Sequence, residues 1–374
     1  MNTGYGRSYV EEQKKSGDIP ASATRGKTIG TILFVLVNIG VIIVTAYLEF
    51  SKDASHAQKV PFLGLNFRFI FAAIGCVLLM IGAETAKYMV MMKATLGSAD
   101  LKTAFQVTAI GKYYDNITPL GTGGQPFQIY FLSKRGHSKG AAASLPITSY
   151  ICTNVAFAIL AVTVMIFGSG AVGSVAVHIA ARIGILCYLF VPATITLFTV
   201  APRAADAILC FFIRIFHRLH IIKDERVTRN KVLLSVDEYR TAIRRMSAKR
   251  GMLALLLLLS LIYHSAMCSL PFFVLRTFGG ATSWATSFCI CVFIYAAVTF
   301  VPTPGNSGAA EGSFYALFSG LTSGYLFWAM LVWRFFCYYY FILQGGCVFG
   351  FNALMRHRNK KRLQTNEIIR EGKE

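Results

Sequence analysis

Two short stretches interrupt the apolar sequence of this chain with proline, glycine and polar residues. The first, at residues 118–124, reads TPLGTGG, and the second, at residues 303–308, reads TPGNSG. Proline removes a backbone donor and glycine lets the chain leave the helix, so each stretch predicts a break between two helices. The helix that starts after a break presents free N–H groups and a partial positive charge, which suit a phosphate group.

Polar side chains around the two breaks predict a path for a charged headgroup. Arg334 lies in the middle of an apolar stretch, and Glu311 is its predicted partner, because an unpaired charge in hydrocarbon costs several kcal/mol. The alternatives are a hinge or packing motif at each break and a purely structural ion pair. The predicted substrate-binding residues are Thr118, Gly121, Gly123, Gly124, Gln125, Gln128, Thr303, Pro304, Gly305, Asn306, Gly308, Glu311 and Arg334.

Three further ionisable residues lie within apolar stretches and are candidates for energy coupling. Glu84 and Lys87 are three residues apart, a spacing at which they can also simply pair with each other on a helix. His264 is a candidate proton relay, and a histidine satisfied within the core is the alternative. The chain shows no nucleophile elbow, metal-ligand spacing or nucleotide-binding loop, so we predict no catalytic residue, no metal site and no cofactor.

The composition is typical of an integral membrane protein. Of the 374 residues, 55% are hydrophobic and 14% are charged, whereas a soluble domain carries about a quarter charged residues. Runs of about 18 or more apolar residues mark bilayer spans. Such stretches occur at 28–48, 69–92, 141–167, 175–201, 251–275 and 325–351. The predicted fold class is therefore an all-α polytopic membrane protein with about six full transmembrane helices.

The basic residues predict how the chain crosses the membrane. The net charge is +20, and Lys and Arg gather before the first span, within 203–250 and after the last span. The positive-inside rule places these segments in the cytoplasm. Regions 99–135 and 283–320, which contain the breaks, then enter from opposite faces, as in an inverted-topology repeat. Re-entrant hairpins are favoured because Lys112 and Asp115 make one arm a poor span, but charge counting leaves crossing hairpins open.

The predicted organisation has three parts. A cytoplasmic N-terminal segment, 1–27, precedes a membrane domain at 28–353, and a basic cytoplasmic tail follows at 354–374. Within the membrane domain, the inverted halves at about 28–201 and 251–353 are joined by segment 202–250, which is basic and amphipathic, as in a helix on the inner leaflet. We expect a bacterial plasma membrane as the location. Nucleic acid is not an expected partner, because the basic clusters flank apolar spans.

The breaks also carry a resemblance to a known family. TPLGTGGQPFQIYFL at 118–132 and PTPGNSGAAEGSFYALF at 302–318, followed by Arg334, resemble the signature regions of the lysylphosphatidylglycerol synthase transmembrane family. This is the flippase-like domain of the multiple peptide resistance factor, and the resemblance runs from about residue 27 to 356. Many relatives carry an acid where this chain has Gln125. The resemblance implies a translocase that moves a phospholipid, such as aminoacylated phosphatidylglycerol, between leaflets.

Two alternatives to a translocase remain open. The resemblance also admits a phosphatidylglycerol lysyltransferase-type enzyme or its membrane subunit, linked to resistance to cationic antimicrobial peptides, with tRNA as a partner at 203–250. A non-catalytic scaffold that recruits a cytoplasmic partner through the same segment is the other alternative. Since the synthase domain of the resistance factor has no counterpart in these residues, a separate lipid synthase is an expected partner. A membrane phospholipid and a second copy of the chain are the other expected partners.

Overall fold

The computed structural model describes residues 64–119, 121, 123–218, 224–247, 250–299, 301–321 and 325–352. The predicted N-terminal segment 1–27, the predicted first span 28–48 and the predicted tail 354–374 lie outside the described residues. Within the described part, every regular element is a helix, which confirms the predicted all-α fold class.

Among the described residues, five helices are long and apolar enough to cross a membrane. They are α3 (Phe67–Leu96), α6 (Lys139–Phe167), α7 (Val175–Val200), α10 (Arg250–Thr277) and a last helix at Leu326–Asn352, which begins with α13 (Leu326–Arg334). Each of them covers one of the apolar stretches that the sequence predicts as spans. The polytopic membrane architecture is therefore confirmed for this part of the chain.

Local sequence explains where several helices begin and end. The side chains of Asp100, Ser138 and Ser283 each accept a hydrogen bond from the backbone N–H three residues further on, at the starts of α4 (Leu101–Ile117), α6 and α11 (Trp284–Val298). These caps satisfy donors that the first turn of a helix leaves free. Gly97 ends α3 with a φ of 74°, in the left-handed region that glycine tolerates.

Two hairpins of shorter helices complete the bundle. The first consists of α4 (Leu101–Ile117) and α5 (Gly124–Ser133), and the second of α11 (Trp284–Val298) and α12 (Ala309–Phe318). At a rise of 1.5 Å per residue these helices are about 15 to 26 Å long, shorter than the ~30 Å hydrocarbon core. The two helices of each hairpin pack against each other. These lengths favour re-entrant hairpins over full crossings.

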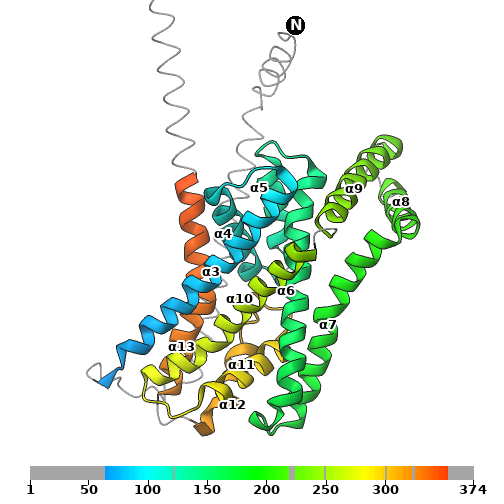
Figure 1. Cartoon of the computed structure of the whole chain (residues 1–374). Helices are drawn as coiled ribbons and strands as arrows, with labels where there is room; N and C mark the ends of the chain where they lie inside the picture. Colours follow the sequence, from blue (N-terminus) through cyan, green and yellow to red (C-terminus); the bar gives the residue numbers. More distant parts are fainter. Residues whose placement is uncertain are drawn as a thin grey trace, which may run out of the picture. The chain divides into compact units, whose positions relative to one another are not determined.

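The tips of the two hairpins meet inside the bundle. Pro119, in the first break, and Pro304, in the second, form an isolated antiparallel bridge. Figure 1 shows α5 and α12 toward opposite ends of the bundle. The two breaks, which are far apart in the sequence, are therefore neighbours in space and are approached from opposite ends.

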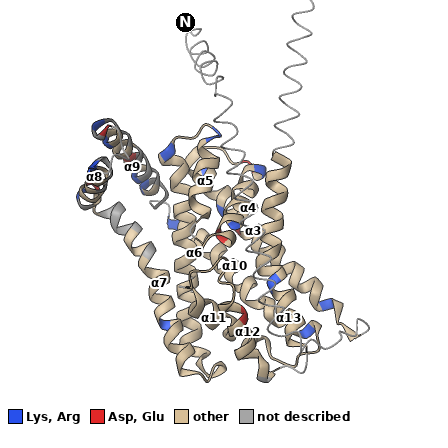
Figure 2. Cartoon of the chain, turned by 180° about the vertical axis from the view of Figure 1, so that it is seen from behind, with Lys and Arg blue, Asp and Glu red and all other residues tan. Residues whose placement is uncertain are grey.

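The basic, amphipathic segment forms two helices, where the sequence led us to expect one. These are α8 (Pro202–Arg218) and α9 (Glu225–Ser247), and α9 packs along α6. An ion pair of 2.9 Å between Arg240 and Asp206 joins them. Figure 2 shows basic residues concentrated on α8 and α9, while the spanning helices are largely uncharged. Three short elements complete the described part: η3 (Ser169–Ala171), η4 (Ser319–Leu321) and a π-helical turn, η5 (Phe335–Tyr339).

Candidate functional site

The first break is held together by side chains of its own hairpin. The hydroxyl of Thr118 accepts a hydrogen bond of 2.9 Å from the N–H of Gly123. The carboxylate of Asp115, on α4, accepts one of 2.9 Å from the N–H of Gly124, the first residue of α5. Gly121 lies in the turn with a φ of 60°. The predicted helix start therefore exists, and two of its N–H groups already have acceptors from this hairpin.

The two glutamines after the first break lie beside a polar cavity. Gln125 and Gln128 both line it, and Gln128 is buried. The side-chain amide of Gln128 donates to the carbonyl of Val107, on α4, at 3.0 Å. It occupies the space that a Cβ at Gly111 would need, so the absence of a side chain at that position permits the contact. Gln125 therefore lies where a polar ligand can reach it.

The second break is a tight turn in left-handed backbone. Gly305 has a φ of 57° and Asn306 a φ of 56°. The side chain of Asn306 donates to the carbonyl of Val298, near the end of α11, at 2.8 Å. The hydroxyl of Thr303 donates to the carbonyl of Ser307 at 2.9 Å. The predicted polar residues of this break thus satisfy its own backbone, as a membrane-embedded break requires.

The predicted ion pair between Glu311 and Arg334 is present and closes the second break. The guanidinium of Arg334 bonds the Glu311 carboxylate, the carbonyl of Gly305 and the hydroxyl of Ser307, the last two at 3.2 Å. Glu311 also accepts from the N–H of Gly308 at 2.5 Å. Both side chains are buried, with 3% of Arg334 and 7% of Glu311 exposed. The pair therefore ties the start of α12 to the last helix.

A local irregularity in the last helix follows Arg334 directly. The π-helical turn η5 occupies Phe335–Tyr339, and the ring of Tyr338 lies against Gly305. The guanidinium of Arg334 is 5.1 Å from the centroid of the Tyr338 ring. Such π turns inside α-helices frequently occur at functional sites. Here the turn brings an aromatic ring and a cation onto the same backbone break.

A cavity of about 60 Å³ lies beside the first break. Helices α3, α4, α5 and α6 contribute to its lining, which is mostly polar. The lining includes the side chains of Glu84, Lys112, Asp115, Gln125, Gln128 and Thr153. A polar space of this size inside a membrane domain has room for about four water molecules at ~15 Å³ each.

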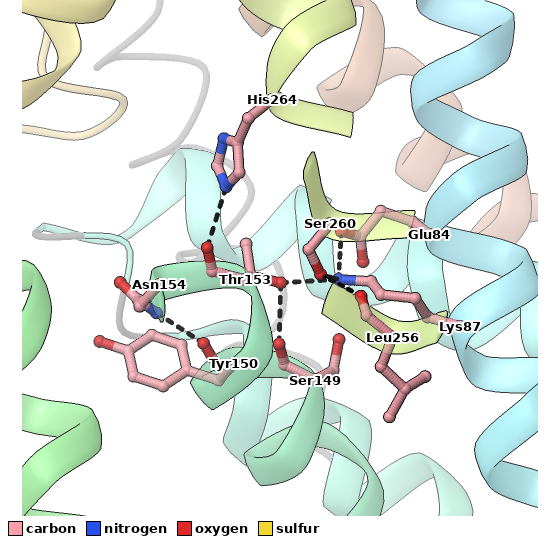
Figure 3. A network of polar contacts seen from close by, with 9 residues as sticks. All are labelled: Glu84, Lys87, Ser149, Tyr150, Thr153, Asn154, Leu256, Ser260 and His264. Carbon is pink, nitrogen blue, oxygen red and sulfur yellow. Dashed lines mark hydrogen bonds and ion pairs between the residues drawn. The ribbon is translucent and has the colours of Figure 1, made fainter. Parts of the chain in front are cut away.

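The three candidates for energy coupling belong to one network (Figure 3), and Glu84 and Thr153 of this network line the cavity. The ammonium of Lys87 contacts the carboxylate of Glu84 at 2.7 Å and the hydroxyls of Thr153 and Ser260 at 2.6 and 3.1 Å. The imidazole Nε2 of His264 is 3.1 Å from the carbonyl of Thr153. The predicted Glu84–Lys87 pair is confirmed, and Lys87 has a partner for each of its three donors.

Two charged residues of the cavity were not among the predicted site residues. Lys112 and Asp115 lie three apart on α4, immediately before the first break. The ammonium of Lys112 is 4.2 Å from the centroid of the Tyr263 ring. Among the described residues no carboxylate forms an ion pair with it. Their spacing, as two opposite charges beside a backbone break, was the signal that could have identified them.

Residues 28–345 match the model of a family described as the lysylphosphatidylglycerol synthase TM region. The matched segment includes both breaks, the polar cavity and Arg334, and it confirms the resemblance carried by the two signature regions. No curated protein matches the chain. Together with the apolar helices, the family match shows a multi-pass membrane protein related to lipid synthesis or flipping.

Proposed function

Because the chain belongs to the lysylphosphatidylglycerol synthase TM region family, we propose that it moves a phospholipid between the two leaflets of a membrane. The observation that carries this proposal is the meeting of two helix breaks, at Pro119 and Pro304, beside a polar cavity. A broken backbone at membrane depth is tolerated only inside protein or facing a water-filled cavity. The polar headgroup would use this interior route while the acyl chains stay in the bilayer.

The arrangement of the hairpins supports alternating access. Each hairpin reaches the contact between Pro119 and Pro304 from its own end of the bundle. A small rocking motion of one hairpin against the other would open the route first to one leaflet and then to the other. The contact between the two breaks is then the gate that the headgroup must pass.

The predicted site residues divide into two groups in this mechanism. Gln125 and Gln128 line the cavity and are available to replace headgroup hydration. Thr118 and Asn306 bond the backbone of their own breaks, so they shape the route rather than solvate the headgroup. Arg334 is neutralised by Glu311, and it would contact a phosphate only when that pair opens.

The proposed substrate is a membrane phospholipid, and aminoacylated phosphatidylglycerol is the candidate suggested by the family's description. We further propose a bacterial plasma membrane with both termini in the cytoplasm. The basic helices α8 and α9, which join the two halves, support this orientation through the positive-inside rule. Energy coupling through Glu84, Lys87 or His264 belongs to the same proposal.

Reconstitution of the full chain into liposomes tests the proposal. A fluorescent phospholipid is placed in both leaflets, and a membrane-impermeant reductant bleaches the outer one. With an active translocase, the protected inner-leaflet fluorescence should also decay. A decay no faster than in protein-free liposomes of the same composition would reject the translocase.

The same preparation also tests the enzyme alternative. The purified chain is incubated with phosphatidylglycerol and lysyl-tRNA, and the lipids are analysed by mass spectrometry. We expect no lysylphosphatidylglycerol, because the cavity offers no predicted catalytic constellation. Formation of that lipid without movement between leaflets would favour the lysyltransferase-type activity instead.

A further inference from the structure

One face of α4 brings three polar side chains to the cavity beside the first break. Thr108, Lys112 and Asp115 are spaced at i, i+4 and i+7, which places them on the same side of a helix. All three line the cavity. They are therefore positioned to contact one bound group together.

The charges on the opposite side of the cavity do not take part. Lys87 gives its donors to Glu84, Thr153 and Ser260, and it is fully buried. The carboxylate of Glu84 is neutralised by that ammonium at 2.7 Å. The charges of Glu84 and Lys87 cancel, and the other two charges that line the cavity are those of Lys112 and Asp115 on α4.

Two donors on α4 can take a further partner from the cavity. The ammonium of Lys112 lies over the ring of Tyr263 and forms a hydrogen bond with that residue, and it attracts the carboxylates of Glu84 and Asp115 without a direct ion pair to either. The hydroxyl of Thr108 is 97% buried and has no hydrogen-bond partner within the described part of the chain. A buried polar group without a partner is costly, which indicates that the site is completed by something polar. An ammonium and a hydroxyl together suit a phosphate oxygen.

An anion alone would leave the site unbalanced. Asp115, one turn after Lys112, also lines the cavity, and its one hydrogen bond within the described part is with the N–H of Gly124. A phosphate held by Lys112 would lie close to this carboxylate, and burying like charges together is unfavourable. A primary ammonium on the same ligand would match Asp115 and restore neutrality.

We therefore propose that this cavity binds the headgroup of a net-neutral aminophospholipid, with its phosphate at Lys112 and Thr108 and its ammonium at Asp115. The inference rests on the proposed function, because it takes the ligand to be a phospholipid in transit. It goes further by assigning the headgroup to the first break, and by selecting a zwitterion over a purely anionic lipid such as phosphatidylglycerol.

Equilibrium binding by the full chain in detergent micelles tests the inference without requiring transport. The probes are phosphatidylethanolamine and phosphatidylglycerol with identical acyl chains, and free phosphoethanolamine is the competitor that separates a lipid from a soluble source. We expect phosphatidylethanolamine to bind about tenfold more tightly than phosphatidylglycerol, the effect of one charge-assisted hydrogen bond. Phosphoethanolamine that competes fully at equal concentration would show a soluble ligand and overturn the lipid assignment.

Two substitutions separate the roles of the charges. Lys112→Met should weaken the binding of both lipids about tenfold, because both lipids carry the phosphate that Lys112 contacts. Asp115→Asn keeps an acceptor for the N–H of Gly124 and should abolish the preference for phosphatidylethanolamine. Lys102→Met is the matched control: Lys102 lies on the same helix with its ammonium 5.7 Å from the Phe351 ring, and it does not line the cavity.

The outcomes keep this inference apart from the proposed function. Equal binding of the two lipids by the wild type, or an unchanged preference in Asp115→Asn, would overturn the zwitterion assignment even if liposomes show lipid movement. If the wild type prefers phosphatidylethanolamine and the variants change binding as predicted, but liposomes show no lipid movement, the binding site is supported and the translocase is rejected. A Lys102→Met variant as weak as Lys112→Met would show a general loss of structure and overturn the assignment to Lys112.

Discussion

The two helix breaks are similar in sequence and meet each other in space, yet their surroundings differ. The first break lies beside a polar cavity with Lys112 and Asp115 on its wall. The second is closed by the buried pair of Glu311 and Arg334, and it is backed by aromatic rings. The ring of Phe314, on α12, stacks on that of Trp333 with centroids 4.8 Å apart, and both side chains are fully buried.

The difference shows that the same kind of helix cap occurs in two different settings. In both breaks a carboxylate accepts from the N–H at or before the start of the new helix, Asp115 at α5 and Glu311 at α12. Glu311 is neutralised by Arg334, whereas Asp115 faces an open cavity. The second break is therefore a rigid joint, and the first is the polar site. The predictions below test this contrast.

The largest effect is expected where the rigid joint loses its cation. Arg334→Ala leaves Glu311 charged and buried, and removes the donor to the carbonyl of Gly305, so the free energy of unfolding should fall by about 3–5 kcal/mol. Denaturant unfolding in micelles measures it. The double variant Arg334→Met with Glu311→Gln should recover part of the loss, and Arg276→Ala, at an exposed position, is the control. A loss no larger than that of Arg276→Ala would show that the joint is not rigid.

A smaller effect should follow from adding a methyl group within the second break. Gly305→Ala places a Cβ against the ring of Tyr338 in left-handed backbone, and we expect a loss of about 3 kcal/mol. Gly308→Ala also has a positive φ but meets no neighbouring atom, so only backbone strain of about 1 kcal/mol is expected. Thermal unfolding of the two variants compares them. Equal losses would mean that the Tyr338 contact does not hold this turn.

At the first break the helix cap should contribute about as much as an ordinary N-cap. Asp115→Ala removes the acceptor for the N–H of Gly124 and should cost about 1 kcal/mol of stability. Asp115→Asn keeps an acceptor and should cost less stability, which makes it the better variant of Asp115 for the binding experiment. A loss above that of Gly305→Ala would contradict the view that the second break is the more rigid one.

The smallest effect concerns the start of the first hairpin. Hydrogen bonds from the Thr103 hydroxyl and backbone N–H lower the pKa of the exposed Asp100 carboxyl from its ordinary value of 3.8. Because the pKa is lower in the folded chain, this cap stabilises the fold above pH 3.8 and is lost as the pH falls through the lowered value. Asp100→Asn should therefore flatten the acid limb of a plot of stability against pH. If the acid limb of Asp100→Asn equals that of the wild type, other groups cause the loss of stability at low pH.

Much of the architecture could be predicted because bilayer physics acts on short windows of sequence. Apolar length predicted α3, α6, α7, α10 and the last helix, and the cost of an unpaired charge predicted that Glu311 would pair with Arg334. The i, i+3 spacing likewise predicted the Glu84–Lys87 pair. Each of these predictions depends on one helix or on one embedded charge. The polar cavity was not predicted, because its walls come from four helices and no single one of them is polar enough to indicate it.

The amino-acid sequence is enough to predict a polytopic helical membrane protein with two proline- and glycine-broken segments. Chain length, apolar runs and the backbone chemistry of proline and glycine are sufficient for that. The packing of the helices is needed to show that the breaks touch at Pro119 and Pro304, that Asp115 caps α5 across its hairpin, and that Lys112 lies over the ring of Tyr263 at the polar cavity. These depend on which segments pack together. A charge is matched or unmatched only by the groups that packing brings within reach.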